Sequence, residues 1–396
     1  MTMEQHLSSG IVKKTLLVFF GVIVLLVIAV NLSASMWVTN YATPYGVTKV
    51  FPNGSTITYN GTGAQPYGIA FDGVNMWVVE FSGTMVTKVQ PNGTMTNYTI
   101  AGVTPMQIAY DNHGSMWAID FIGNTIDKIN VSTGTSVNFA LNGTSQPTSL
   151  AFDGVDMWVA YNSGNVTRIN ISTGIGFNYR GTGTTIYAMA YDNQGSMWLS
   201  SVSSPGNLTK VNISNGVMVN FTAPNNQPYS MAYDYNGSLW IGNYGDNSVT
   251  KFNISSGTSI NYKGTGVQPY AIAYDGVNMW TGDTNGGSAG NNNVTQVFPN
   301  GTMVNYTSSS MSPRGIAYDG ALLSQAPCIP PINYTWMVTY PQTCNKVNVT
   351  TGNNSIVVTS SGTLTLINGA NVSTKALNMT GTGDKVFILS KSMLIL

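Results

Sequence analysis

Short runs in which hydrophobic and polar residues alternate follow one another along the chain from residue 36 onward. Between residues 66 and 100 the runs are PYGIAFD, NMWVVEF, MVTKVQ and TMTNYTI, separated by the turn residues DG, SG and PNG. Alternation with a period of two predicts β-strands, and Gly beside Asp, Ser or Asn predicts tight turns. No stretch beyond residue 34 shows a sustained helical period. The pattern therefore predicts an all-β chain built from four-stranded units.

All eight tryptophans occupy one position of a repeat of forty to forty-two residues. The last spacing is stretched to 56 residues by an inserted segment. A period near forty with four strands per unit is typical of a β-propeller, whose blades surround a central channel. We expect each indole to be buried between neighbouring blades. The tryptophans are Trp37, Trp77, Trp117, Trp158, Trp198, Trp240, Trp280 and Trp336.

A strand that ends in Ala-Phe/Tyr-Asp precedes seven of the eight tryptophans, and its Asp opens a turn that contains Gly. A carboxylate at the start of such a turn accepts hydrogen bonds from the turn's backbone N–H groups. We therefore expect a structural role for these residues. They are Asp72, Asp111, Asp153, Asp192, Asp234, Asp275 and Asp319.

Eight Trp strands and seven strands of the Ala-Phe/Tyr-Asp type leave the first unit without its inner strand. The tail ALNMTGTGDKVFILS matches the connector SINYKGTGVQPYAIA by residue class. We therefore favour eight blades spanning residues 35–396, with an insertion at 321–345 and a closing strand near Lys385 to Ser390. In the seven-bladed alternative, the strand before Asp319 closes the ring and the last 75 or so residues are an addition.

Residues 15–34 carry no charge and include the run LLVFFGVIVLLVIAV, which is apolar enough to cross a bilayer. Lys13 and Lys14 precede this run, and the next basic residue is Lys49. The positive-inside rule then places residues 1–14 in the cytoplasm and the chain beyond residue 34 outside the cell. We predict one transmembrane helix that acts as a signal anchor in the cell membrane. A cleaved signal peptide ending near Ser33-Ala34-Ser35 is the alternative.

Only 8% of the residues are charged, with fifteen basic and fifteen acidic side chains. This composition offers no basic surface for a nucleic-acid backbone, so we expect no nucleic-acid partner. Twenty-one Asn-x-Ser/Thr sequons beyond the apolar segment predict a glycoprotein. The two cysteines, Cys328 and Cys344, lie in the inserted segment, and outside the cell such a pair is most simply a disulfide.

The pattern P-x-x-I-A-x-D-x-x-G-x-x-W, followed by a strand that contains Lys, resembles the virginiamycin B lyase-like and NHL-type β-propellers over about residues 36 to 358. The resemblance implies a propeller fold. It also implies either a binding or scaffold protein or a metal-assisted lyase that uses His and acidic residues on one face. The chain has two histidines: His6 precedes the apolar segment, and His113 falls in a turn expected on the opposite face. The resembled lyase would therefore lack its imidazole here, and we assign no catalytic residues.

Three acidic residues share the position three residues after the Trp: Glu80, Asp120 and Asp283. Second strands should end near one mouth of the channel, and Glu80 and Asp120 belong to adjacent blades. Carboxylate oxygens are ligands that Ca²⁺ or Mg²⁺ prefers. These residues are the candidate site for a divalent cation. The alternative is that this varied polar position simply faces water.

The same mouth should carry the residues near the start of each inner strand, which include Tyr67, Tyr187, Tyr229, Tyr270 and Arg314. Tyrosines in a ring can stack on sugar rings or other flat groups. The alternative is that these tyrosines pack between blades. A basic residue also recurs once per blade in the third strand, as at Lys88 and Lys128, and this repetition favours a structural role.

Two functions remain open. The favoured one is a non-catalytic recognition or surface-structural protein that is anchored in the membrane and binds glycans, envelope components or partner proteins through its loop face. The alternative is a metal-dependent lyase or hydrolase of the virginiamycin B lyase-like type, for which Glu80, Asp120 and Asp283 are the available acids.

Overall fold

The computed structural model describes residues 34–320 with short gaps, and then nine strands beyond residue 335. The gaps are at residues 144, 182–183, 203–205, 223–225, 265, 267, 285–292 and 308–311. Every described element is a β-strand, so the all-β prediction is confirmed. No helix long and apolar enough to span a bilayer occurs among the described residues. The predicted anchor, residues 15–34, lies outside them apart from Ala34.

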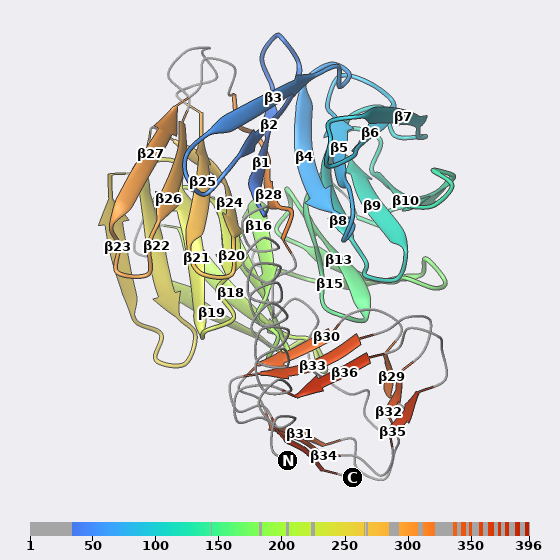
Figure 1. Ribbon diagram of the computed structural model, residues 1–396, viewed down its shortest axis with the longest axis vertical. Helices are drawn as coiled ribbons and strands as arrows, with labels where there is room; N and C mark the ends of the chain where they lie inside the picture. The colour runs from blue at the N-terminus through green and yellow to red at the C-terminus, as the bar shows by residue number, and fades with distance from the viewer. Residues whose placement is uncertain are drawn as a thin grey trace, which may run out of the picture.

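Seven four-stranded antiparallel sheets surround a central channel and form a β-propeller (Figure 1). In each sheet the innermost strand is followed outward by the next three. Blades 2 to 4 contain β4 (Pro66–Phe71), β5 (Met76–Glu80), β6 (Met85–Val89), β7 (Met95–Thr99); β8 (Pro105–Tyr110), β9 (Ser115–Asp120), β10 (Thr125–Asn130), β11 (Ser136–Ala140); β12 (Pro147–Phe152), β13 (Asp156–Tyr161), β14 (Val166–Asn170) and β15 (Gly176–Tyr179). Blades 5 to 7 contain β16 (Ile186–Tyr191), β17 (Ser196–Ser201), β18 (Asn207–Asn212), β19 (Met218–Thr222); β20 (Pro228–Tyr233), β21 (Ser238–Asn243), β22 (Ser248–Asn253), β23 (Ser259–Lys263); β24 (Pro269–Tyr274), β25 (Met279–Asp283), β26 (Asn293–Val297) and β27 (Met303–Thr307).

Blade 1 joins the two ends of the propeller. Its inner strand, β28 (Ile316–Tyr318), pairs antiparallel with β1 (Met36–Asn40), and Met36 lies opposite Tyr318. The blade is completed by β2 (Gly46–Val50) and β3 (Thr56–Asn60). The prediction of eight blades is therefore wrong, and the seven-bladed alternative is confirmed. Because β28 supplies the missing inner strand, blade 1 already has four strands like the other six blades and needs none from the tail.

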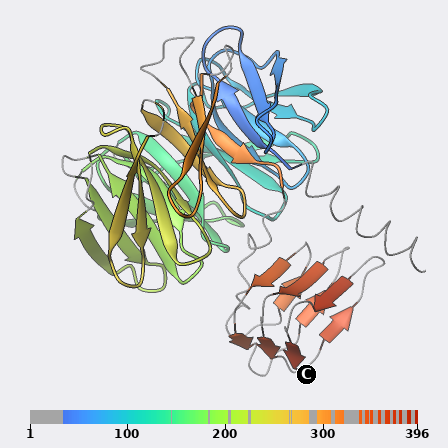
Figure 2. The same ribbon diagram turned by 60° about the vertical axis from the view of Figure 1, so that its left-hand side comes forward.

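The tail does not supply a closing strand. Its segment Lys385–Ile388 is β36, which pairs in parallel with β33 (Thr363–Ile367), whereas the strands of each blade pair antiparallel. Nine short strands form three parallel sheets, an arrangement typical of a β-helix (Figure 2). The other strands of these sheets are β29 (Trp336–Val338), β30 (Gln342–Asn345), β31 (Asn348–Thr350), β32 (Ile356–Val358), β34 (Asn371–Ser373), β35 (Leu377–Met379) and β37 (Met393–Ile395).

This tail corrects two further predictions. The eighth tryptophan, Trp336, begins β29 and so belongs to no blade, and the propeller does not extend to residue 396. Residues 321–335 of the predicted insertion lie outside the described residues, and so does the predicted disulfide, since Cys328 is among them.

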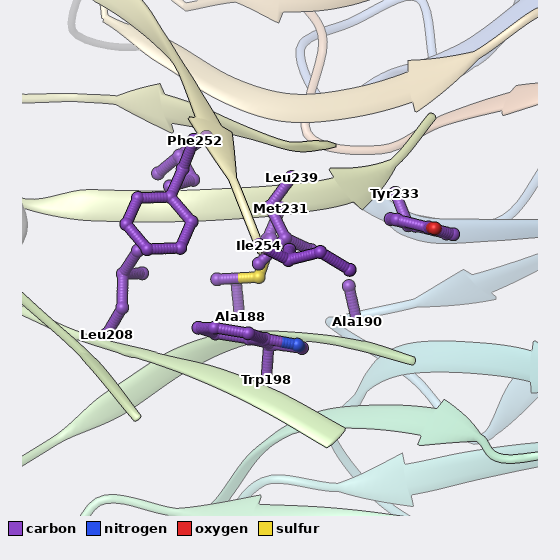
Figure 3. Packing of buried hydrophobic residues seen from close by; sticks show 10 residues of the cluster. Ala188, Ala190, Trp198, Leu208, Met231, Tyr233, Leu239, Phe252 and Ile254 are labelled. Atoms are coloured by element: carbon purple, nitrogen blue, oxygen red, sulfur yellow. The ribbon is translucent and has the colours of Figure 1, made fainter. Parts of the chain in front are cut away.

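Seven buried tryptophans hold the blades together, as expected. The indoles of Trp37, Trp77, Trp117, Trp158, Trp198, Trp240 and Trp280 are at most 2% exposed. In the contact between blades 5 and 6, Trp198 lies among Ala188, Met231 and Leu239 (Figure 3). Each blade therefore buries one indole in its packing against a neighbouring blade.

Each indole is also tied to the turn Asp of its own blade. The Nε1–H group of every one of the seven donates to that carboxylate at 2.6–3.0 Å. In blade 5, Asp192 Oδ2 accepts from Trp198, while Oδ1 accepts from the backbone N–H groups of Gln194 and Ser196. The structural role predicted for these aspartates is therefore confirmed by their contacts.

Replacing Asp192 with Ala should destabilise the propeller by about 3 kcal/mol, because three donors lose their acceptor and two of them are buried. Chemical denaturation followed by tryptophan fluorescence measures this change in the free energy of unfolding. The control is Asp246→Ala, in a loop where the carboxylate bonds to exposed Asn226, and it should cost about 1 kcal/mol or less. Equal losses in the two variants would contradict a special role for the Asp–Trp pair.

Candidate functional site

The inner strands leave a cavity at each end of the central channel, and Ile69 lines both. At one end the lining comes from the starts of the inner strands, and we call this end the arginine mouth. Its cavity measures about 170 Å³, and Tyr187, Tyr229, Tyr270 and Arg314 line it. At the other end the lining comes from the residues that precede the turn aspartates, and we call it the aspartate mouth.

The predicted tyrosines contact one another at the arginine mouth. Tyr187 stacks on Tyr229 with 4.6 Å between ring centroids, and Tyr229 lies 5.3 Å from Tyr270. The hydroxyl groups of Tyr67 and Tyr270 form a hydrogen bond. The structure therefore brings all four tyrosines together, with Arg314 beside Tyr270. What they bind stays a prediction.

The guanidinium group of Arg314 lies between two aromatic rings. Its Cζ atom is 4.5 Å from the centroid of Tyr270 and 5.0 Å from that of Tyr41. Within the described residues this group forms no ion pair, and its Nε atom is buried without a hydrogen-bond partner. A positive charge packed on aromatic faces with no counter-charge is well placed to receive an anion.

Sequence analysis missed four aromatic residues at this mouth. Tyr244 lies 4.8 Å from Tyr229, Tyr41 and Phe81 lie 6.0 and 5.4 Å from Tyr67, and Phe81 lies 6.4 Å from Phe121. All four follow a repeat Trp by four residues, so the repeat itself carried this signal. They extend the aromatic surface outward from the channel.

The phenols of Tyr67, Tyr229 and Tyr270 stay protonated at neutral pH. Burial raises the pKa of Tyr67, Tyr229 and Tyr270 above the ordinary value of 10, and neighbouring tyrosines raise it further for Tyr67 and Tyr229. These groups are therefore hydrogen-bond donors and apolar faces, and they are unsuited to remove a proton from a substrate.

The three predicted metal-binding acids do not line the arginine mouth. Glu80, Asp120 and Asp283 are only 0%, 3% and 1% exposed and lie inside their blades. In blade 2 the Gly63 N–H group donates to Glu80 Oε1 at 2.7 Å, and the Thr87 hydroxyl donates to the same oxygen. A Cβ atom at Gly63 would overlap the carboxylate, so a larger residue at this loop position would displace Glu80 from these hydrogen bonds.

Blade 7 repeats the arrangement with Asp283. The carboxylate accepts hydrogen bonds from the Gly266 N–H group and from the hydroxyls of Thr281 and Thr295. Gly266, like Gly63, precedes its acid by seventeen residues. Burial raises the pKa of Asp283 from 3.8 to about 7, although the three hydrogen bonds act in the opposite direction.

Blade 3 contains a second carboxylate that sequence analysis missed. Asp127 accepts from the Gly102 N–H group at 3.0 Å, while Asp120 accepts from the N–H groups of Val103 and Thr104. Burial would raise the pKa of Asp120, but these hydrogen bonds lower it overall. Burial raises the pKa of Asp127, and the charge of Asp120 adds to that effect. Through these hydrogen bonds the two carboxylates fix the loop that leads from β7 into β8.

The residues described do not form the expected divalent-cation site. They include no group of three or more His, Cys, Asp or Glu side chains that could hold a metal ion. Among the oxygens of the three predicted acids, Glu80 Oε2 is the one that is buried without a hydrogen-bond partner. One oxygen is too few for Ca²⁺, which takes six to eight.

His113 was expected on the face opposite the candidate site. It lies in the turn after β8 and contacts Phe152, which lines the aspartate mouth, so this expectation is confirmed.

Comparison with known proteins identifies the class of the fold. A family model described as "Two component regulator propeller" matches residues 222–245, and no curated protein matches the chain. A streptogramin B lyase structure aligns with a TM-score of 0.57 at 15% identity, covering 64% of this chain and 86% of the lyase. The fold is therefore a β-propeller similar to that of the streptogramin B lyase structure.

Two structures of virginiamycin B lyase from Staphylococcus aureus specify the resemblance. The selenomethionine-substituted enzyme aligns with a TM-score of 0.58 at 17% identity, covering 72% of this chain and 97% of the enzyme. A catalytically inactive form with quinupristin gives 0.55 at 19% identity, covering 61% and 83%. The predicted resemblance to virginiamycin B lyase-like propellers is thus confirmed for the fold.

Asp283 should make the stability of the propeller depend on pH. In the folded protein its carboxyl stays protonated up to about pH 7, whereas its unperturbed pKa is 3.8. The free energy of unfolding therefore falls between about pH 4 and pH 7, by up to roughly 1.4 kcal/mol per pH unit from this group. Asp283→Asn cannot ionise and should lose this dependence.

Denaturation of the two proteins at several pH values measures the difference, and effects of other carboxyl groups cancel in the comparison. We expect the wild type to lose stability relative to Asp283→Asn as pH rises. Parallel pH profiles for the two proteins would refute the buried, protonated state of Asp283.

Proposed function

We propose that this chain is a non-catalytic recognition protein whose ligand binds at the arginine mouth. The observation that carries the proposal is the guanidinium of Arg314, which is held between Tyr41 and Tyr270 without a counter-charge in the described part of the chain. The residue is half-buried and its Nε atom is buried without a hydrogen-bond partner, so a site of this kind is completed by an anionic group from the ligand.

The ligand class follows from the side chains around Arg314. A guanidinium binds a carboxylate through two parallel hydrogen bonds, and tyrosine faces stack on the apolar face of a sugar ring. The cavity of about 170 Å³ can hold one sugar unit or its carboxylate, while the half-buried rings of Tyr229 and Tyr244 can contact the next unit. We therefore assign a glycan or envelope polymer that carries carboxylate groups.

The proposed setting is the cell exterior. It rests on the uncharged run at residues 15–34, on the lysines before it and on the sequons beyond it. In this proposal the run anchors the protein in the membrane, the sequons carry glycans, and Cys328 and Cys344 form a disulfide. A ligand in the cell envelope would then lie within reach of the propeller.

Arg314→Gln should weaken binding of a carboxylate-bearing glycan by about tenfold to a hundredfold, the range expected for one charged hydrogen-bonding group. A glycan array identifies the tightest acidic glycan, and titration calorimetry then measures the dissociation constant. The matched control is Arg180→Gln at an exposed position, which should leave binding unchanged. Thermal unfolding of both variants shows whether loss of binding reflects loss of fold.

Three outcomes would contradict the proposal. The first is binding that survives Arg314→Gln, and the second is binding that survives the double substitution Tyr229→Ala, Tyr270→Ala in a folded protein. The third is cleavage of quinupristin in the presence of Mg²⁺ or Ca²⁺, which would favour the lyase alternative. The reaction is followed by liquid chromatography with mass spectrometry, because elimination that opens a ring leaves the mass unchanged while hydrolysis adds one water.

A further inference from the structure

The aspartate mouth contains the larger of the two channel cavities, about 350 Å³, which lies within the range of small-molecule sites. Its lining includes one aromatic residue from each of the seven blades, together with Asn112, Asn193 and Tyr235. No charged side chain lines it. The seven aromatic residues, each directly before a turn Asp, are Phe71, Tyr110, Phe152, Tyr191, Tyr233, Tyr274 and Tyr318.

Charges around this cavity are separated along the radius of the propeller. The seven turn aspartates follow the innermost strands, whereas the basic residues stand in the third strands, 5.0–5.7 Å from the tryptophan rings. The carboxylates are therefore closer to the channel than the cations are. A ring of carboxylates therefore encloses the aromatic lining, and the cations lie outside that ring.

Ion pairs cancel only part of this negative charge. Asp319 pairs with Lys49 at 2.9 Å and Asp153 with Arg168 at 3.7 Å, and the other five turn aspartates have no ion pair among the residues described. Besides burial, the charges of the turn aspartates also raise the pKa of tyrosines that line the cavity. Burial, and after it the charges of nearby turn aspartates, raise the pKa of Tyr274 to about 12.

We propose that the aspartate mouth binds an organic ammonium ion with small alkyl groups, such as a quaternary ammonium head group. Aromatic rings attract such ions through their faces, and the surrounding carboxylates add a long-range attraction. A bare metal ion is a poorer fit, because no carboxylate lines the cavity to replace its water. A neutral sugar could stack on the aromatic rings, but the negative charge of the carboxylates would not attract it. This site lies at the opposite end of the channel from Arg314 and does not depend on the proposed function.

Choline and its uncharged analogue 3,3-dimethylbutan-1-ol, which have nearly the same shape, test the proposal with the full chain. Titration calorimetry should detect choline and not the alcohol, and choline affinity should fall as salt screens the carboxylates. Tyr274→Leu keeps an apolar side chain and removes one ring. We expect about twofold to thirtyfold weaker choline binding, the range for loss of one cation–π contact.

The control is Tyr229→Leu, which removes a ring from the arginine mouth and should leave choline binding unchanged. Phe71→Leu is a second test, should Tyr274→Leu fail to keep the wild-type tryptophan emission. Equal affinity for the alcohol, no dependence on salt, or unchanged choline binding in both folded aspartate-mouth variants would overturn the proposal. Displacement of bound choline by a neutral saccharide would also overturn it.

Discussion

The hydrogen bond between a turn Asp and the indole of the next strand is the interaction on which the rest of the propeller depends. In six blades it joins neighbouring strands of one hairpin, but in blade 1 it joins Asp319 to Trp37, 282 residues apart. Lys49 pairs with the same carboxylate, and the N–H group of Asp319 donates to the Ser35 carbonyl. The contact that builds each blade therefore also closes the ring.

Ring closure also determines where the candidate site lies. Arg314 precedes the closing strand, and its N–H group and that of Gly315 donate to the Thr39 hydroxyl of β1. Without this pairing the guanidinium would not be fixed between Tyr41 and Tyr270. The channel then has a cation at one mouth and a ring of carboxylates around the other, so a chain with no net charge presents two mouths of opposite character.

The repeat made much of the fold predictable, because Trp, turn Asp and inner-strand Tyr recur every forty residues or so in units of four short strands, a pattern typical of a propeller. The blade count failed because the β-helix tail resembles a blade connector by residue class and contains Trp336. The acids were misplaced for a different reason: whether a side chain at the end of a strand faces the channel or its own loop depends on that loop. The glycine seventeen residues before Glu80 and before Asp283 could have indicated that each acid accepts a hydrogen bond from its own loop.

Equilibrium unfolding of chains shortened from the C-terminus tests most directly that residues 316–318 close a seven-bladed ring. A chain that ends at Gly320 keeps β28 and Asp319 and lacks only Trp336 of the eight tryptophans, so it should unfold cooperatively and its seven blade tryptophans should show the emission of buried indoles. A chain that ends at Gly315 should lose both properties. Loss of cooperative unfolding already in the chain that ends at Gly320 would contradict the account, because it would mean that the tail is part of the ring.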